Sequence, residues 1–244
     1  CVLGPSISWT DMRDINETHK LYDLFGRTAL TNTTGLAPIP GVGLPIVSWI
    51  QKHRPHIWNN THYILSAKDF ILFRLTGIIA TDISLPARSM LYDLNRLDWS
   101  DWICQKAGIN TALLPPVRYL PWEEWGTLLP QMATRLGLPE GVVIAAGGGD
   151  DPAATLGAGG INVGDIVVGT GTASSWRVVT DQPKPDLSGR CDLAPHLVPD
   201  RYLYEFVIPG TGTSFRWFRQ NFCASTDDGT LFSYEELLDQ AAEV

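Results

Sequence analysis

The sequence predicts an α/β fold, because its two halves have different patterns that together include helices and strands. In the first half, apolar residues recur at helical spacing behind residues that commonly begin a helix. From Val142 onward, short β-branched runs alternate with glycine-containing turns and further helical segments. With 244 residues, 44% of them hydrophobic, the chain can bury the core of one large domain or two modest ones.

The expected helices begin at capping residues or prolines and stop at glycines or prolines. Thr10, Ser66 and Ser100 have side chains that accept hydrogen bonds from the first turn of a helix. Gly26 and Gly77 stand where a left-handed residue commonly ends one. We therefore expect helices over residues 11–25, 44–52, 66–77, 100–107, 130–137, 213–222 and 233–243, with another that begins near Pro152.

The expected strands are short β-branched runs bounded by turn residues. The run before residue 169 and the run after residue 173 are joined by a Gly/Thr turn, which is the pattern of a tight hairpin. We expect strands over residues 78–83, 142–146, 165–169, 173–179 and 202–208.

Charge and composition argue against several classes of function. The net charge is −8 and no lysine or arginine cluster offsets it, so nucleic acid is not an expected partner. The four cysteines are scattered and the five histidines show no ligand spacing, so we predict neither a metal site nor a disulfide framework. A reducing cytoplasm is the expected location. No apolar run approaches the roughly 20 residues that cross a bilayer, so no membrane partner is expected.

The most informative segment runs from Val142 to Arg177. A β-branched run enters three glycines and meets Asp150 and Asp151. Glycines let a backbone approach a ligand closely, because they have no Cβ, and a short carboxylate after them is suited to accepting a proton. The alternative is that the two aspartates cap the helix that begins near Pro152, where acidic residues are favoured.

A second glycine turn follows the next β-branched run. It consists of Gly169, Thr170, Gly171 and Thr172. Its bare N–H groups and hydroxyls suit phosphate oxygens, although the same residues also suit a hairpin, and one turn can serve both purposes. The same four letters recur at 210–213, either by chance or as a structural counterpart. One carboxylate beside one anion cradle predicts phosphoryl transfer to a hydroxyl.

An early segment places Trp9 beside Asp11 and Arg13. One interpretation is a helix N-terminus with an acidic first turn. The other is a polyol site, where the indole packs on a C–H face and the charged groups bind hydroxyls.

Several short motifs occur along nearly the whole chain. They are Trp9-x-Asp11-x-Arg13; Thr34-Gly35-Leu36 with Pro40 and Trp49; Leu75-Thr76-Gly77 and Thr81-Asp82 with Arg88, Met90, Leu91, Asp93 and Trp99; Gly148-Gly149-Asp150; Gly169-Thr170-Gly171; and Gly212 with Trp217. Each motif is weak by itself. In this order and spacing, they resemble the FGGY carbohydrate kinases, a group within the actin-like, hexokinase-type ATPases.

The resemblance implies an actin-like/ribonuclease H-like α/β ATPase fold of two domains, only partly present in this chain. Residues 1–158 would be the sugar-binding N-terminal domain without its start, and residues 159–244 the beginning of the nucleotide-binding C-terminal domain. The implied activity is phosphorylation of a sugar hydroxyl, with ATP and Mg²⁺ as cofactors. Asp150 would be the general base that deprotonates the attacking hydroxyl, as a carboxylate does in other kinases.

The resemblance also implies a sugar site. Trp9 would line it, with Asp11, Arg13 and Asp151 close by. Asp151 stands where relatives often have glutamine or asparagine, and the carboxylates of Asp150 and Asp151 are expected to raise each other's pKa. Gly41 replaces a tyrosine that packs on glycerol in glycerol kinases, which favours a wider pocket and a pentulose such as xylulose, or a related sugar.

The nucleotide site is implied in the same way. The residues expected to form it are Gly169, Thr170, Gly171, Thr172, Gly212 and Arg216. The first four would face the β- and γ-phosphates, and the last two would lie along the nucleotide. The family's D-x-G-T-[TS] loop, which contributes to phosphate and Mg²⁺ binding, is expected to precede Cys1, so we assign no metal ligand here.

Three further expectations concern the whole protein. A small-molecule sugar is the expected partner, and a homodimer is left open. Because parts of both domains are expected outside these residues, we expect the 244-residue chain alone to show no measurable kinase turnover. Two alternatives remain: a catalytically silent sugar-binding or regulatory relative, and an actin-like ATPase or phosphatase that uses water as acceptor.

Overall fold

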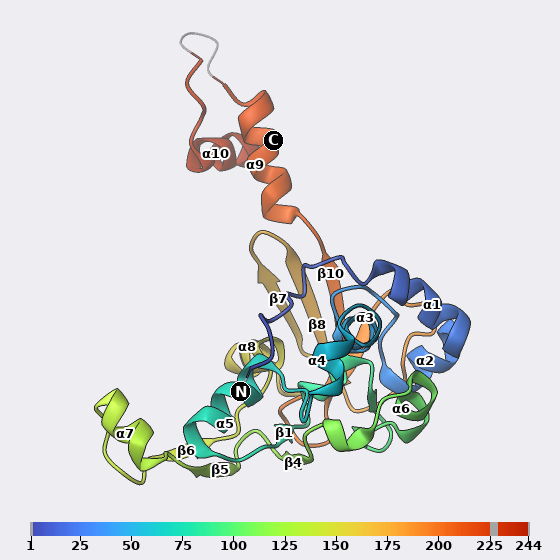
Figure 1. Ribbon diagram of the computed structural model, residues 1–244. Coiled ribbons are helices and arrows are strands. Elements are labelled where there is room, and N and C mark those ends of the chain that lie inside the picture. The colour runs from blue at the N-terminus through green and yellow to red at the C-terminus, as the bar shows by residue number, and fades with distance from the viewer. Residues whose placement is uncertain (1, 225–228, 244) are drawn as a thin grey trace.

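A computed structural model describes residues 2–224 and 229–243, and its elements are labelled in Figure 1. The helices are α1 (Ile15–Phe25), α2 (Arg27–Thr34), α3 (Gly43–His53), α4 (Pro55–Asn59), α5 (Ala67–Thr76), α6 (Asp101–Ala107), α7 (Pro130–Leu136), α8 (Asp150–Gly157), α9 (Thr211–Phe222) and α10 (Tyr234–Ala242), with short 3₁₀ helices η1 (Pro86–Ser89) and η2 (Thr111–Leu113). The strands are β1 (Thr81–Asp82), β2 (Tyr92–Asp93), β3 (Asp98–Trp99), β4 (Val117–Tyr119), β5 (Glu124–Thr127), β6 (Val143–Ala145), β7 (Ile166–Thr170), β8 (Ser174–Thr180), β9 (Asp192–Pro195) and β10 (Tyr202–Ile208).

The main sheet has four antiparallel strands in the order β7, β8, β10, β9. Its central pair, β8 and β10, places Arg177 directly opposite Glu205 and Val179 opposite Leu203. All four of these residues are buried. Because side chains alternate across a strand, the two charged residues share a face with the two apolar ones. The sheet therefore turns an ion pair toward the interior of the protein.

The main hydrophobic core lies among α1, α2, α3 and α6, which Figure 1 shows gathered on one side of the body. Its buried residues are Leu21, Phe25, Leu30, Leu36, Leu44, Val47, Met90, Leu91, Ile103, Cys104, Ile109 and Leu114. Burying one large apolar side chain contributes roughly 1.5–3 kcal/mol, so this cluster is a rigid base for the segments attached to it.

Helix α1 begins four residues later than predicted. Its N-cap is Asp14 rather than Thr10, because residues 11–13 form a separate turn in which Asp11 binds Arg13. The buried carboxylate of Asp14 accepts hydrogen bonds from Gly41 N at 3.0 and 3.2 Å. The start of α1 is therefore tied to the loop before α3.

Other ends follow the predicted capping residues. Ser66 accepts a hydrogen bond from Asp69 N at the start of α5, and Gly77 ends that helix in the left-handed conformation. Ser100 caps α6 in the same way. The strand predicted over 78–83 is reduced to the two residues of β1.

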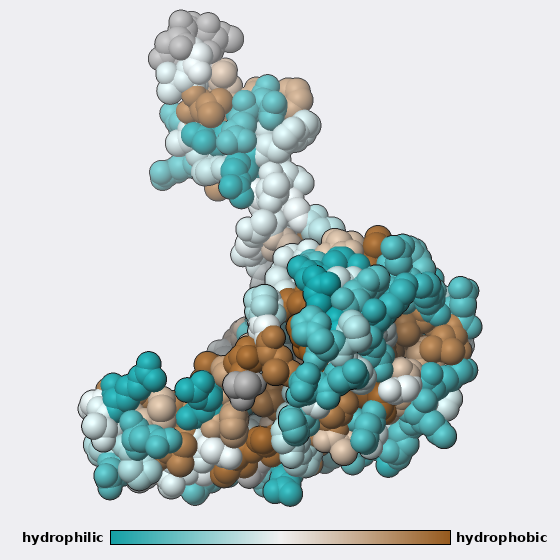
Figure 2. Space-filling view, in the orientation of Figure 1, coloured by the Kyte–Doolittle hydropathy of each residue, from teal (hydrophilic) through white to brown (hydrophobic). Residues whose placement is uncertain are grey.

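Helices α9 and α10 form an arm that stands apart from the body in Figures 1 and 2. Phe215 of α9 packs against Tyr234 of α10, with ring centroids 5.3 Å apart. The guanidinium of Arg219 lies over the Tyr234 ring at 4.8 Å. The two helices thus hold each other, while Trp217 and Phe222 of α9 remain exposed.

Every helix within residues 2–224 and 229–243 is too short or too polar to span a membrane.

Candidate active site

Gly148 and Gly149 lead from β6 into α8, whose first residue is Asp150. A Cβ on Gly148 would lie 2.4 Å from Leu197 Cδ2, so a side chain there would have to displace Leu197. The N-cap is Gly149 and no side chain caps α8, so the predicted capping role of Asp150 and Asp151 is wrong. Asp150 is instead exposed at the N-terminal end of the helix, where the helix dipole favours a negative charge.

A buried series of hydrogen-bonded and charged groups contacts the glycine loop before α8. Ser84 Oγ accepts a hydrogen bond from Gly149 N at 2.9 Å and donates one to Asp82 Oδ1. Asp82 is fully buried, and its Oδ2 lies 2.9 Å from Lys68 Nζ. Lys68 also donates to the carbonyl of Ala146 at 3.0 Å. Lys68 of α5 therefore fixes the start of the loop, and Ser84, in the segment after β1, fixes its end.

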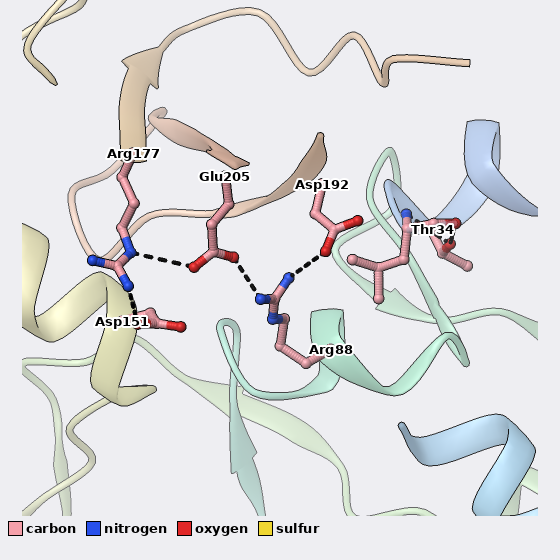
Figure 3. Close-up of polar contacts among 7 residues, drawn as sticks. Thr34, Arg88, Asp151, Arg177, Asp192 and Glu205 are labelled. Carbon is pink, nitrogen blue, oxygen red and sulfur yellow. Dashed lines mark hydrogen bonds and ion pairs between the residues drawn. The ribbon is translucent and has the colours of Figure 1, made fainter. Parts of the chain in front are cut away.

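A second chain of charged groups reaches α8 from the main sheet (Figure 3). Arg177 Nη2 is paired with Asp151 Oδ1, and Arg177 Nε lies 3.2 Å from Glu205 Oε1. The other Glu205 oxygen is 2.5 Å from Arg88 Nη2, and Arg88 Nη1 is 3.1 Å from Asp192 Oδ2. Positive and negative groups alternate along this charge network, which joins η1, α8, β8, β9 and β10.

The environment of Asp151 differs from the predicted one. Burial raises the pKa of Asp151, and Glu205 raises it further, while Arg177 and Arg88 oppose the shift. The carboxylate that raises the Asp151 pKa is therefore Glu205 on β10. The side chain of Asp151 is 43% exposed, so its second oxygen stays within reach of solvent.

A cavity of about 40 Å³ lies beside Asp150 and Asp151. Its lining also includes Ser84, Arg88 and Glu205. This volume accommodates a water molecule or two, and it is far too small for a sugar. A larger ligand would therefore have to reach Asp150 from its solvent-exposed side.

Trp9 lies in a turn and is 80% exposed, so its indole face is free for a ligand. The backbone of this turn passes close to Gly41, which has a φ of 81°. A Cβ on Gly41 would lie 2.1 Å from the carbonyl oxygen of Trp9, a backbone atom that cannot swing aside. The absence of a side chain at residue 41 thus sets the path of the Trp9 segment.

Asp11 and Arg13 bind each other rather than facing an open site. Arg13 Nη2 is 2.7 Å from Asp11 Oδ2, and this hydrogen-bonded pair lowers the pKa of Asp11. The Arg13 guanidinium also lies 5.0 Å from the ring centroid of Trp49 on α3. Within the described part of the chain, no hydrogen bond or ion pair joins Trp9, Asp11 or Arg13 to α8.

The predicted phosphate turn is the hairpin between β7 and β8. Gly169 and Thr170 end β7, and Gly171 and Thr172 lie in the turn. Thr170, Gly171 and Thr172 are exposed. A Cβ on Gly171 would meet nothing closer than 3.8 Å. The tip is therefore open to a ligand.

The second Gly-Thr-Gly-Thr string lies against the first one. Gly212 N donates to the carbonyl of Gly171 at 3.2 Å, and Thr213 N donates to the carbonyl of Thr172 at 3.4 Å. Ser174 and Thr211 share a hydroxyl hydrogen bond of 2.8 Å. The two strings thus touch and join the hairpin to the start of α9, although the first ends a strand and forms a turn whereas the second begins a helix. Arg216 follows one turn later on the exposed surface of that helix.

A family model described as the FGGY family of carbohydrate kinases, N-terminal domain, matches residues 1–157. The chain belongs to the FGGY family. Solved FGGY kinases share its architecture: xylulose kinase from Rhodospirillum rubrum has a TM-score of 0.91 at 25% identity and covers 100% of this chain and 49% of its own. The predicted actin-like α/β fold class is therefore confirmed.

Curated FGGY relatives show the same partial coverage. Xylulose kinase from Bacillus subtilis is 30% identical over 237 residues, which are 97% of this chain and 46% of that protein. Autoinducer-2 kinase from an Enterobacter strain is 30% identical over 222 residues, which are 88% of this chain and 38% of that protein. The chain spans about half the length of the curated relatives that it matches.

Sequence reasoning missed the residues that support this candidate site. Arg88 and Asp82 occur only as members of the sequence motifs, and Ser84, Arg177 and Glu205 lie in none of those motifs. A signal for the last two existed, because each is a charged residue on the same strand face as a buried apolar residue. The register that sets them opposite each other could not be derived from the sequence.

Proposed function

We propose that the protein transfers the γ-phosphoryl group of ATP to a hydroxyl of a sugar. The observation that carries this proposal is the exposed carboxylate of Asp150, held at the start of α8 by a glycine loop whose two ends are both anchored. A carboxylate in such a position can accept the proton of a substrate hydroxyl. Relatives named as xylulose and autoinducer-2 kinases support the same class of reaction.

Each group would have a defined task in this reaction. The sugar oxygen attacks the γ-phosphorus, the bond to the β–γ bridging oxygen breaks, and the hydroxyl proton passes to Asp150. Asp150 lies in the first turn of α8, on the exposed side where a substrate hydroxyl can reach its carboxylate. Closure of the two domains around both substrates would exclude water from the reacting groups.

The sugar would bind on the open side of Asp150. Trp9 supplies an exposed indole that packs on the C–H face of a sugar. Asp11 pairs with Arg13, and Arg13 lies over Trp49, which supports this segment. The half-exposed carboxylate of Asp151 can accept a hydrogen bond from a sugar hydroxyl. The names of the relatives favour a pentulose such as xylulose as the substrate.

The nucleotide would bind where the two Gly-Thr-Gly-Thr strings meet. Thr170 and Thr172 offer hydroxyls to the β- and γ-phosphates, and Gly171, beside Gly169, offers an uncrowded backbone. Gly212 and Arg216 lie on the adjoining α9. Among the described residues, no cluster of three or more acidic, histidine or cysteine side chains could hold a metal. Mg²⁺ would enter with the ATP phosphates, since it commonly uses only one or two protein carboxylates.

These sites suggest which part of the chain binds each substrate. We assign sugar binding to residues 1–158 and the beginning of the nucleotide-binding domain to residues 159–244, and we place the protein in the cytoplasm. The charge network crosses this division, because Asp151 and Arg88 belong to the first part and Arg177, Glu205 and Asp192 to the second.

The proposal is tested by a sugar panel on the full-length protein with Mg-ATP, in which ADP release and sugar phosphate are both measured. ADP and phosphorylated sugar should appear in equal amounts and only when a pentulose or related sugar is present. ADP release without sugar would instead indicate a water-using ATPase. Sugar binding by calorimetry without any turnover would indicate a silent relative.

Replacing Gly41 with alanine is expected to raise the Kd for the sugar about 10-fold. The new Cβ would collide with the Trp9 backbone, and a positive φ itself costs about 1–2 kcal/mol for a residue with a side chain. Calorimetry with the preferred sugar measures the effect. Gly26→Ala is the matched control, because Gly26 has a φ of 75° but nothing within 4 Å of its added Cβ. Equal Kd values for both variants would contradict the role given to Trp9.

Replacing Gly212 with alanine is expected to raise the KM for ATP about 10-fold with little change in the KM for sugar. The added Cβ would lie 2.3 Å from the carbonyl oxygen of Gly171, so the hairpin and α9 would have to separate. Initial rates at varied ATP measure the effect, which corresponds to about 1.4 kcal/mol. Gly157→Ala serves as control, since its Cβ would meet nothing within 4 Å. An unchanged KM for ATP would place the nucleotide elsewhere.

A further inference from the structure

We propose that Arg177 is a positioning residue for the base: it holds Asp151, and through Asp151 it sets the orientation of the first turn of α8, where Asp150 lies. This inference rests on the proposed kinase function. Arg177 lies on the other side of the predicted domain division from both aspartates, so the contact also links the two parts of the site.

The orientation of the Arg177 guanidinium is fixed by two carboxylates. Its Nη2 is paired with Asp151, its Nε lies 3.2 Å from Glu205, and only 6% of its side chain is exposed. The planar guanidinium presents its N–H groups in a rigid fork, so it can bridge two carboxylates in a fixed geometry. Burial removes most of the water that would otherwise compete for these groups.

Helix α8 depends on such external contacts. It has eight residues, its N-cap is Gly149, and no side chain of its own caps it. Two contacts from other segments hold its first turn: the hydrogen bond from Gly149 N to Ser84, and the ion pair from Asp151 to Arg177. Because Asp150 and Asp151 are consecutive helical residues, a fixed Asp151 defines the direction in which the Asp150 side chain leaves the helix.

Loss of Arg177 would leave the carboxylates of Asp151 and Glu205 without the positive charge between them. Asp151 and Glu205 are near enough that Glu205 raises the pKa of Asp151. Without the guanidinium between them, two carboxylates would share a partly buried space with only Arg88 to offset them. Their repulsion would push the first turn of α8 away from the sheet, and the Asp150 carboxylate would move with it.

Arg177 also lies close along the chain to the predicted phosphate turn. It is on β8, three residues after Ser174, which begins the strand next to the Gly171–Thr172 turn. A short, rigid strand therefore connects the groups expected at the phosphates to the arginine that holds the base helix. The distance between the base and the transferred phosphoryl group would be set by this connection.

The test compares Arg177→Met, Arg177→Lys and Asp151→Asn in the full-length protein. Arg177→Met should lower kcat about 10- to 100-fold, since a misplacement near 1 Å can cost that much, while both KM values change less than about 3-fold. Arg177→Lys, which can reach only one of the two carboxylates, should recover part of kcat. The double variant Arg177→Met with Asp151→Asn should have about the same kcat as the less active of the two single variants, because the two residues act through one contact.

The controls separate this inference from a loss of folding and from the proposed function itself. Arg135→Met removes an exposed arginine of α7 and should keep the wild-type kcat. Hydrogen exchange of the α8 amides reports on the helix without any activity, and it should speed up in Arg177→Met but not in Arg135→Met. An unchanged kcat, additive losses in the double variant, or unchanged exchange in α8 would overturn the positioning role. A wild-type protein that phosphorylates no sugar would overturn the proposed function, while the exchange measurement would still decide the role of Arg177.

Discussion

Asp150→Asn is expected to lower kcat for sugar phosphorylation by about 10²–10⁴-fold, the usual contribution of a general base. Asparagine has nearly the same shape but cannot accept the proton of the attacking hydroxyl. The side chain of Asp150 does not cap α8, so the substitution should leave the helix intact. The KM for sugar should change little, and the free energy of unfolding should stay within about 0.5 kcal/mol of wild type.

Steady-state kinetics at saturating Mg-ATP measure this effect. Asp23→Asn is the matched control, because it makes the same chemical change at an exposed carboxylate on α1. Its kcat should equal that of the wild type. Near-normal turnover by Asp150→Asn would mean that another group accepts the proton.

Asp82→Ala is expected to lower the free energy of unfolding by about 3–5 kcal/mol, as is common when one partner of a buried ion pair is removed. Asp82 is fully buried, and it contacts Lys68 Nζ, Ser84 N and Ser84 Oγ. Alanine would leave the ammonium of Lys68 with Asp69 Oδ1 at 3.4 Å and the Ala146 carbonyl as its nearest acceptors. The glycine loop before α8 would lose its anchor at the same time.

Urea unfolding followed by circular dichroism measures the loss. Asp82→Asn keeps an acceptor for Ser84 and should cost less than Asp82→Ala. Asp23→Ala, at an exposed position, should change the free energy of unfolding by no more than about 0.5 kcal/mol. A loss under about 1 kcal/mol for Asp82→Ala would show that the buried pair contributes little to the anchor.

Local parts of the fold could be predicted from the sequence because local chemistry determines them. Ser66 and Ser100 cap their helices as their side chains allow, and Gly77 ends α5 because glycine adopts positive φ readily. The β-branched runs around residue 171 form the predicted hairpin. Helix α2 was not predicted, because its threonine-rich sequence has no clear apolar period. Strand β9 was not predicted, because it follows a loop and forms through its pairing with β10.

The candidate site was predicted less completely, because its supports join residues that lie far apart in the sequence. Asp150 and the hairpin were identified from their glycines, and their roles remain predictions. The contacts from Gly149 to Ser84 and from Asp151 to Arg177 span 65 and 26 residues. The capping role given to Asp150 was wrong, since Gly149 takes the N-cap position and leaves the carboxylate free.

The difference in burial between the two charged assemblies has a consequence for ionic strength. Arg177 and Glu205 are both almost fully buried, so mobile ions cannot approach this pair, and the contact between them should be nearly independent of salt. Asp11 and Arg13 are more open to solvent, at 25% and 43% exposure, where physiological salt screens charges over about 8 Å. The Arg177–Glu205 end of the charge network is thus shielded from the ionic surroundings, whereas the Asp11–Arg13 pair is in electrostatic contact with them.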